Sequence, residues 1–168
     1  MKKIFALICI LFTFSCDDGN FEIASFEFET KISHCDEYLL YRLSTGEHKE
    51  ALIVTLTDKE IKQSEEAIPL VNISKTGPYT VTYRIFDQEV TSAYFCKTIP
   101  PTEPQTVKNW IGGGGTILIV NTAVKDEDDK IIAYKHTITL NDLALNNNDE
   151  SLLFDPSYFY GDFETTVK

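Results

Sequence analysis

The chain has 168 residues, with 26 Asp or Glu against 15 Lys or Arg and a formal net charge of −11. This length suits one domain that buries a hydrophobic core. The negative charge repels phosphate backbones and disfavours nucleic-acid binding. It also opposes adsorption to anionic lipid, so any association with a membrane requires an anchor.

The first predicted element is an apolar leader over residues 1–15. Lys2 and Lys3 precede an almost unbroken apolar run at residues 4–14, and Cys16 follows the leader. A membrane-spanning helix needs roughly 20 apolar residues, and this run is well short of that length. The layout is therefore typical of a cleaved signal rather than of a permanent membrane span.

The leader ends in Thr13, Phe14, Ser15 and Cys16, and acidic residues come next. These residues resemble a bacterial lipoprotein signal of the Bacteroidetes type, in which Ser15 and Cys16 match the pattern while Thr13 and Phe14 depart from its strict form. The resemblance implies a lipid on the sulfur of Cys16, with residues 16–20 as the tether to the membrane. It implies a location in the cell envelope at the outer membrane, on either the periplasmic or the external face. An ordinary secretory signal is the alternative.

The remainder, residues 21–168, is patterned as a single domain of strands. Apolar and polar side chains alternate with a period of two, as they do in half-buried strands. The first half predicts extended segments at residues 26–32, 37–44, 51–57 and 68–74. Between the last two, residues 58–67 are charged and predict a surface loop, with a short helical turn as the alternative.

The second half predicts further strands at residues 79–86, 90–98, 116–124, 131–140 and 157–166. The first two are expected to pair as a hairpin, and the next two as a second hairpin across an acidic turn. Residues 99–104 hold three prolines, which lack the N–H that a ladder needs, so they predict an irregular crossover between two sheets. Residues 141–150 predict a polar loop or one helical turn.

This pattern predicts an all-β fold, namely an antiparallel β-sandwich of about eight strands. The separation of Cys35 and Cys96 resembles that of immunoglobulin-like domains, but Trp110 lies after the pair rather than between its members, so the topology stays open. An even pair of cysteines in an exported domain predicts one disulfide, Cys35–Cys96. Two separate buried thiols are the alternative.

Aromatic residues near a glycine run form the first candidate site. Residues 112–115 are four glycines, which predict a flexible loop or a place where the chain folds back over the end of the sandwich. No Lys follows them, which argues against a phosphate-binding loop. Trp110 beside this run, with Tyr158 and Tyr160, is a candidate stacking platform for a sugar or a protein partner. Core packing is the alternative role for these aromatic rings.

The acidic turn forms the second candidate site. Asp126, Asp128 and Asp129 are candidate Ca²⁺ ligands, because hard carboxylate oxygens suit this ion. A solvated hairpin tip is the alternative. No other cofactor is expected.

Catalytic motifs are missing from the sequence. It contains neither the Gly-x-Ser-x-Gly elbow of serine hydrolases nor the His-Glu-x-x-His motif of metalloproteases. The sequence therefore predicts a non-catalytic, lipid-anchored binding or structural module with a protein or glycan partner. An envelope hydrolase that acts on glycans through paired carboxylates and a Ca²⁺-dependent adhesion domain are the alternatives.

Overall fold

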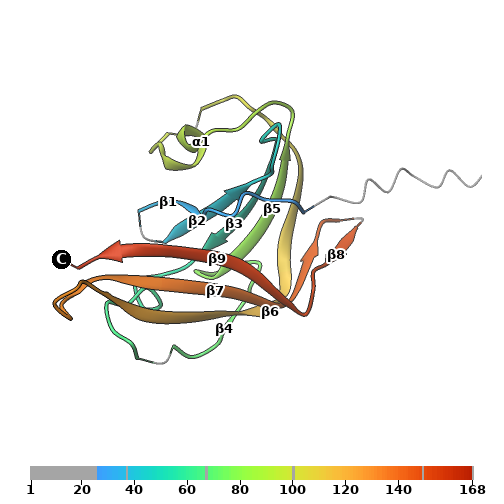
Figure 1. Cartoon of the computed structure of the whole chain (residues 1–168). Helices are drawn as coiled ribbons and strands as arrows, with labels where there is room; N and C mark the ends of the chain where they lie inside the picture. The colour runs from blue at the N-terminus through green and yellow to red at the C-terminus, as the bar shows by residue number, and fades with distance from the viewer. Residues whose placement is uncertain (1–25, 37, 67, 100, 149, 168) are drawn as a thin grey trace, which may run out of the picture.

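The computed structural model (Figure 1) describes residues 26–36, 38–66, 68–99, 101–148 and 150–167. Within them lie nine antiparallel strands and one five-residue helix, which confirms the all-β prediction. The elements are β1 (Ser33–Cys35), β2 (Leu39–Leu43), β3 (Glu50–Thr55), β4 (Val71–Asn72), β5 (Thr80–Phe86), α1 (Ser92–Cys96), β6 (Thr106–Lys125), β7 (Ile131–Asn146), β8 (Ser151–Leu153) and β9 (Ser157–Thr166).

One continuous sheet makes both layers of the fold. Its strand order is β1-β2-β3-β5-β6-β7-β8, with β9 also paired to β7 and β4 paired to β6. The long strands β6 and β7 curve from one layer into the other, so the two halves of the sheet face each other (Figure 1). The architecture is sandwich-like, but the predicted crossover between two separate sheets at residues 99–104 is wrong. That irregular segment leads from α1 to β6, and β6 pairs with β5 in the same sheet.

The main core lies between the two halves of the sheet. Alternation along each strand turns every second side chain inward, where the apolar ones are buried. Residues of the first half in this core include Leu40, Leu52, Val54, Val81 and Tyr83, and residues of the second half include Ile117, Ile119, Ile138, Leu140 and Tyr160. Burying one such aliphatic side chain stabilises the fold by about 1.5–3 kcal/mol.

The bend between the halves is built from the glycine run. Register shifts interrupt the pairing of β6 with β7 between Gly112 and Gly114 and again between Gly114 and Thr116. Gly115 has a φ of +103°, and a Cβ there would lie only 2.7 Å from the backbone oxygen of Asn141. Glycine is therefore required where the two strands turn the corner together.

Two loop predictions fail at this corner. The glycines of residues 112–115 lie inside β6, not in a flexible loop, and β7 continues to Asn146 through much of the predicted loop at residues 141–150. Hydrogen bonding to neighbouring strands outweighs the low strand propensity of the glycine and asparagine residues. The bulges absorb the bend without ending either strand.

The predicted hairpin of residues 79–86 with 90–98 is also wrong. β5 pairs with β3 and β6, and the following segment forms α1 on the outer face of the first half (Figure 1). There the ring of Phe95 stacks on that of Tyr41 with centroids 4.2 Å apart, as part of a small second core. The segment after β5 therefore covers this outer apolar patch as a helix and does not pair with β5 as the sequence pattern predicted.

Residues 26–32 do not form the regular strand that their alternation predicts. Apart from a bridge between Phe28 and Ser44, the segment is irregular. The guanidinium of Arg42 donates to two backbone oxygens of this segment. Its Nε lies 2.5 Å from the oxygen of Glu29, and its Nη2 lies 3.2 Å from the oxygen of Phe28. Two backbone hydrogen bonds, from Glu29 N–H to Leu43 and from Thr45 N–H to Glu27, join the segment to the end of β2, and the buried side chain of Arg42 holds it in addition.

Candidate functional site

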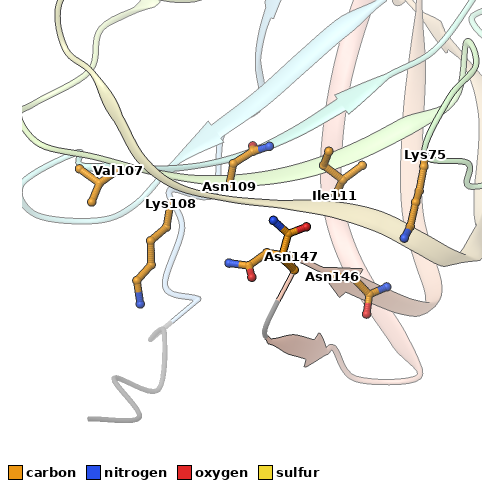
Figure 2. A pocket seen from close by; sticks show the side chains of 8 residues that line it. Lys75, Val107, Lys108, Asn109, Ile111, Asn146 and Asn147 are labelled. Carbon is orange, nitrogen blue, oxygen red and sulfur yellow. The ribbon is translucent and has the colours of Figure 1, made fainter. Parts of the chain in front are cut away.

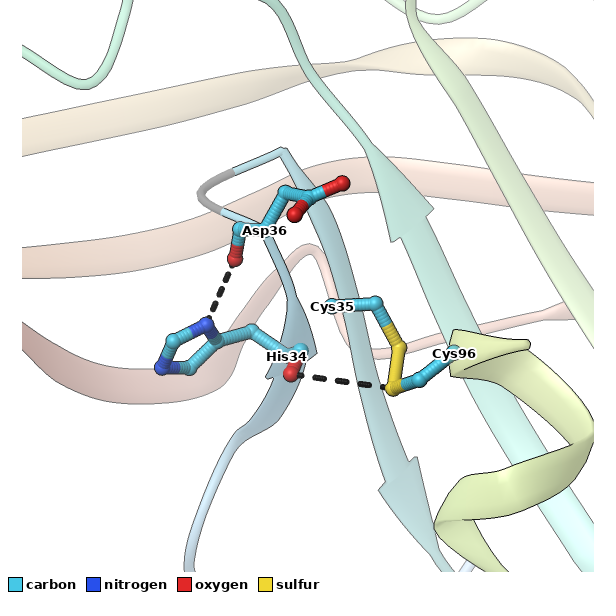
Figure 3. Close-up of a disulfide and its surroundings, with 4 residues drawn as sticks. All are labelled: His34, Cys35, Asp36 and Cys96. Carbon is cyan, nitrogen blue, oxygen red and sulfur yellow. Dashed lines mark hydrogen bonds between the residues drawn. A yellow bond between two sulfur atoms is a disulfide. The ribbon is translucent and has the colours of Figure 1, made fainter. Parts of the chain in front are cut away.

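The predicted disulfide between Cys35 and Cys96 is present (Figure 3). It joins β1 to α1 across 61 residues, with Cα atoms 5.1 Å apart. Closing a loop of this length stabilises the folded state by about 4 kcal/mol in the chain-entropy account. The bond fixes the helix against the outer face of the first half of the sheet.

The predicted aromatic platform does not form, because two of its three residues are inside the core. Trp110 is 3% exposed and stacks on Tyr83, with ring centroids 5.2 Å apart. Tyr160 is fully buried, and its hydroxyl donates to the backbone oxygen of Leu52 at 3.0 Å. Tyr158 is half-buried against the same core, so core packing accounts for all three rings.

The acidic turn of the β6–β7 hairpin is held by hydrogen bonds rather than gathered around an ion. One carboxylate oxygen of Asp126 accepts the backbone N–H groups of Asp128 and Lys130, each at 3.0 Å. Asp129 faces Lys125 at 3.4 Å. Nowhere in the described part of the chain do three or more metal-binding side chains converge, so the predicted Ca²⁺ ligands do not form a site there.

An open groove of about 740 Å³ lies beside the corner of the sheet (Figure 2). It runs along the first part of β6, next to the point where the pairing of β6 with β7 ends at Asn146. It reaches Lys75 in the turn after β4. We refer to it as the corner groove. The described residues that line it are Lys75, Val107, Lys108, Asn109, Ile111, Asn146, Asn147 and Asn148.

Hydrogen bonds orient two of the amides in the corner groove. Arg84 Nε donates to Asn109 Oδ1 at 3.1 Å, and a guanidinium cannot accept, so the amide nitrogen of Asn109 faces away from Arg84. The hydroxyl of Ser151 donates to Asn146 Oδ1 at 2.7 Å. The Nδ2 of Asn146 then lies over Gly113, in the space that a Cβ at Gly113 would occupy. Both amides are held with their oxygens engaged and their N–H groups unused by these bonds.

Charge in the corner groove is positive, although the chain as a whole is acidic. Lys75 and Lys108 contribute ammonium groups, and none of the described residues that line the groove is a carboxylate. Lys108 Nζ lies 3.9 Å from Glu150 outside the lining and 5.7 Å from the ring centroid of Trp110. The paired carboxylates that a glycan hydrolase requires therefore do not meet among these lining residues.

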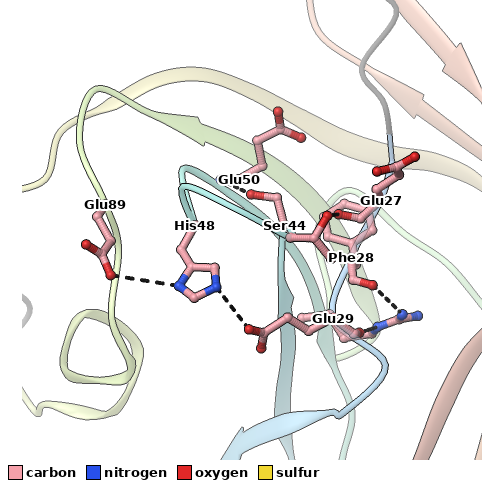
Figure 4. A network of polar contacts seen from close by, with 9 residues as sticks. Glu27, Phe28, Glu29, Ser44, His48, Glu50 and Glu89 are labelled. Atoms are coloured by element: carbon pink, nitrogen blue, oxygen red, sulfur yellow. Dashed lines mark hydrogen bonds and ion pairs between the residues drawn. The ribbon is translucent and has the colours of Figure 1, made fainter.

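The described histidines serve other contacts. His48 Nε2 lies 3.0 Å from Glu29 and its Nδ1 lies 3.8 Å from Glu89, which links the β2–β3 turn to two neighbouring segments (Figure 4). The hydroxyl oxygen of Ser44 accepts the backbone N–H of Glu50 at 3.1 Å. These are contacts that hold the fold together and do not form a nucleophile and base pair.

Buried His136 occupies the second half of the sheet. Its Nδ1 lies 2.6 Å from Asn121 Oδ1, and its Nε2 lies 2.8 Å from Thr165 Oγ1. A buried imidazole with both ring nitrogens in hydrogen bonds is satisfied as a structural group.

Sequence reasoning missed the corner groove. Its polar residues come from three separate parts of the chain, and the one local signal was the asparagine run at residues 146–148. Cys16 and the tether at residues 16–20 lie outside the described residues. No protein-family model, curated protein or solved structure matches this chain. Within the described ranges, no helix is both long enough and apolar enough to cross a membrane.

Proposed function

We propose that this protein is a non-catalytic, lipid-anchored binding module of the cell envelope and that the corner groove binds an acidic oligosaccharide. The observation that carries the proposal is the set of hydrogen-bond donors in that groove. Lys75 and Lys108 are cationic donors, and the amides of Asn109 and Asn146 have their oxygens occupied. The matching ligand is rich in acceptors.

The lining matches the chemistry of an acidic sugar. Carboxylates of uronic acids pair with ammonium groups, and ring hydroxyls accept from amide N–H groups. Val107 is 61% exposed, and together with half-buried Ile111 it offers an apolar surface to the C–H face of a sugar ring. Hydrogen bonds to charged groups contribute about 1.5–3 kcal/mol each, so each lysine should make a measurable contribution to the affinity.

The envelope location is part of the same proposal. It is supported by the lipoprotein-like residues around Cys16 and by the Cys35–Cys96 disulfide, since such bonds persist in oxidising compartments. Labelling of intact cells with a membrane-impermeant reagent, before and after lysis, distinguishes the external from the periplasmic face. The Cys16→Ala protein should leave the membrane fraction, and its retention there would contradict lipid anchoring through this residue.

Ligand binding is tested by titrating a uronic-acid oligosaccharide into the full-length protein by calorimetry. Lys75→Ala and Lys108→Ala should each weaken binding about ten-fold or more, because each removes one charge-assisted hydrogen bond. Lys59→Ala is the matched control, since this lysine is exposed in the loop after β3 and is not one of the residues that line the groove. Equal affinities in all three variants would refute the assignment, and cleavage of the oligosaccharide abolished by one side-chain change would favour the hydrolase.

A further inference from the structure

The strand β1 and the strand β9, which pairs with β7 beside the main strand order, face each other across an open seam. The path β1-β2-β3-β5-β6-β7-β9 contains seven strands, and each pairs antiparallel with its neighbour. Because direction alternates along the path, its first and last strands run the same way. A ring of antiparallel pairs needs an even number of strands. One added strand, antiparallel to both β1 and β9, would complete it.

The seam is shut at one end by side chains. A Cβ on Gly161 would lie 3.0 Å from Cγ1 of Ile32, so the N-terminal segment presses directly on β9 there. Beside it, Arg42 Nη1 donates to the backbone oxygen of Tyr160 at 2.6 Å. These contacts occupy the edge of β9 up to its midpoint.

The other end of the seam is open. A groove of about 410 Å³ lies there, lined by residues of β1, α1 and β9 that include Ser33, Ser92 and Glu164. The rings of His34 and Phe163 approach across it, with centroids 5.5 Å apart. The rings are in contact, but the two backbones are not hydrogen-bonded to each other.

Backbone groups of β9 face this opening. Val167 N–H donates to Ile132 in the direction of β7, so by alternation the N–H and C=O groups of Glu164 and Asp162 point the opposite way. The outward oxygen of Thr166 agrees with this alternation, since it accepts from the Gln63 side chain at 2.7 Å. Among the described strands β9 pairs with β7 alone, which leaves the outward groups of two residues for another strand.

We propose that an extended, basic segment of a partner protein adds as a strand between β9 and β1 at the open end of the seam. Main-chain hydrogen bonds to an exposed sheet edge are the usual source of affinity in strand addition. The exposed side chains of Asp162 and Glu164 flank the position of the added strand. Asp162 lies 3.9 Å from Lys135 and Lys31 also lines the groove, so the acidic character rests mainly on Glu164 and on the net charge of −11. Cross-strand pairs of opposite charge therefore favour lysine or arginine at alternate positions of the partner.

The test uses a synthetic hexapeptide with lysine at alternate positions and valine between them, and the full-length protein. Glu164→Pro removes the outward N–H without removing a bond to β7, because proline is tolerated where the N–H faces away from the ladder. Glu164→Gln is the matched control, which alters the charge but keeps the N–H. The proline variant should bind the peptide at least about ten-fold more weakly than the glutamine variant does.

Hydrogen exchange on the unmodified protein is a second test, and it does not depend on whether the proline variant folds. Bound peptide should slow exchange of the amides in residues 162–166, and a peptide with glutamate in place of lysine should not. The proposal is overturned by equal binding to the two Glu164 variants, by no binding to the unmodified protein, or by protection elsewhere. A dimer of this chain formed through β9 would overturn it too. The oligosaccharide titration addresses a different groove, so either proposal can fail alone.

Discussion

Substitution of Gly115 tests how the sheet turns its corner. Gly115→Ala places a Cβ 2.7 Å from the backbone oxygen of Asn141 and 2.8 Å from that of Asp142. Neither atom can rotate away as a side chain would, so the backbone of β6 or β7 must shift. The neighbouring Gly114→Ala is the matched control, because a Cβ there meets no atom within 4 Å.

Two terms set the size of the effect. A φ of +103° costs an alanine about 1–2 kcal/mol, and forcing backbone atoms apart in a packed region costs about 1–3 kcal/mol more. Gly115→Ala should therefore lower the free energy of unfolding by about 2–5 kcal/mol. Gly114→Ala should leave it unchanged or raise it by about 0.4–1 kcal/mol, because alanine restricts the unfolded chain.

Urea unfolding followed through the fluorescence of Trp110, the single tryptophan of the chain, measures both variants. In thermal unfolding the same difference corresponds to a gap in Tm of about 5–20 °C for a domain of this size. Unfolding free energies of the two variants that agree within about 0.5 kcal/mol would show that the corner does not depend on the backbone of Gly115.

Three further predictions concern stability. Reduction of the Cys35–Cys96 disulfide should lower the free energy of unfolding by about 4 kcal/mol, and identical urea midpoints with and without reductant would contradict the role given to it. Arg42→Met should lower the free energy of unfolding by about 3–5 kcal/mol, because the buried guanidinium donates to three backbone oxygens. A loss below about 1 kcal/mol would mean that water satisfies these oxygens in place of the guanidinium. Burial raises the pKa of Tyr160 well above 10.0, so below about pH 10 the phenol is neutral in both states, and above it only the unfolded chain ionises. The free energy of unfolding should then fall as pH rises past 10, and it should fall less steeply in Tyr160→Phe. Equal slopes against pH in the unmodified protein and the variant would exclude Tyr160 as the cause of the fall.

Local patterns were sufficient for the strands whose partners lie nearby. The last strand was predicted at the bounds that β9 has, and buried and exposed side chains alternate along it except at Tyr160 and Gly161, which are both buried. The hairpin around the acidic turn was also predicted, although β6 and β7 extend far beyond it. In these segments the pairing partner and the burial pattern agree with local propensity.

Elements that depend on distant contacts could not be predicted in the same way. Four consecutive glycines lose much conformational entropy when they are fixed in a strand, so the sequence alone does not predict a strand there. The close approach of the strands that neighbour β6 explains why glycine is needed. The same corner places Trp110 inside the core, which was one of the two roles that the sequence left open for this ring. The corner groove brings together Lys75, Lys108 and Asn146, which no spacing rule connects.

The binding assignment is tested most directly by mapping where an acidic oligosaccharide contacts the protein. In ¹H–¹⁵N spectra of the full-length protein titrated with a uronic-acid tetrasaccharide, we expect the largest shifts at the backbone and side-chain amides of Asn109 and Asn146 and at the backbone of Lys108. Shifts centred on the seam between β1 and β9 or on the acidic turn, or an unchanged spectrum at saturating ligand, would contradict the assignment of the corner groove as the binding site.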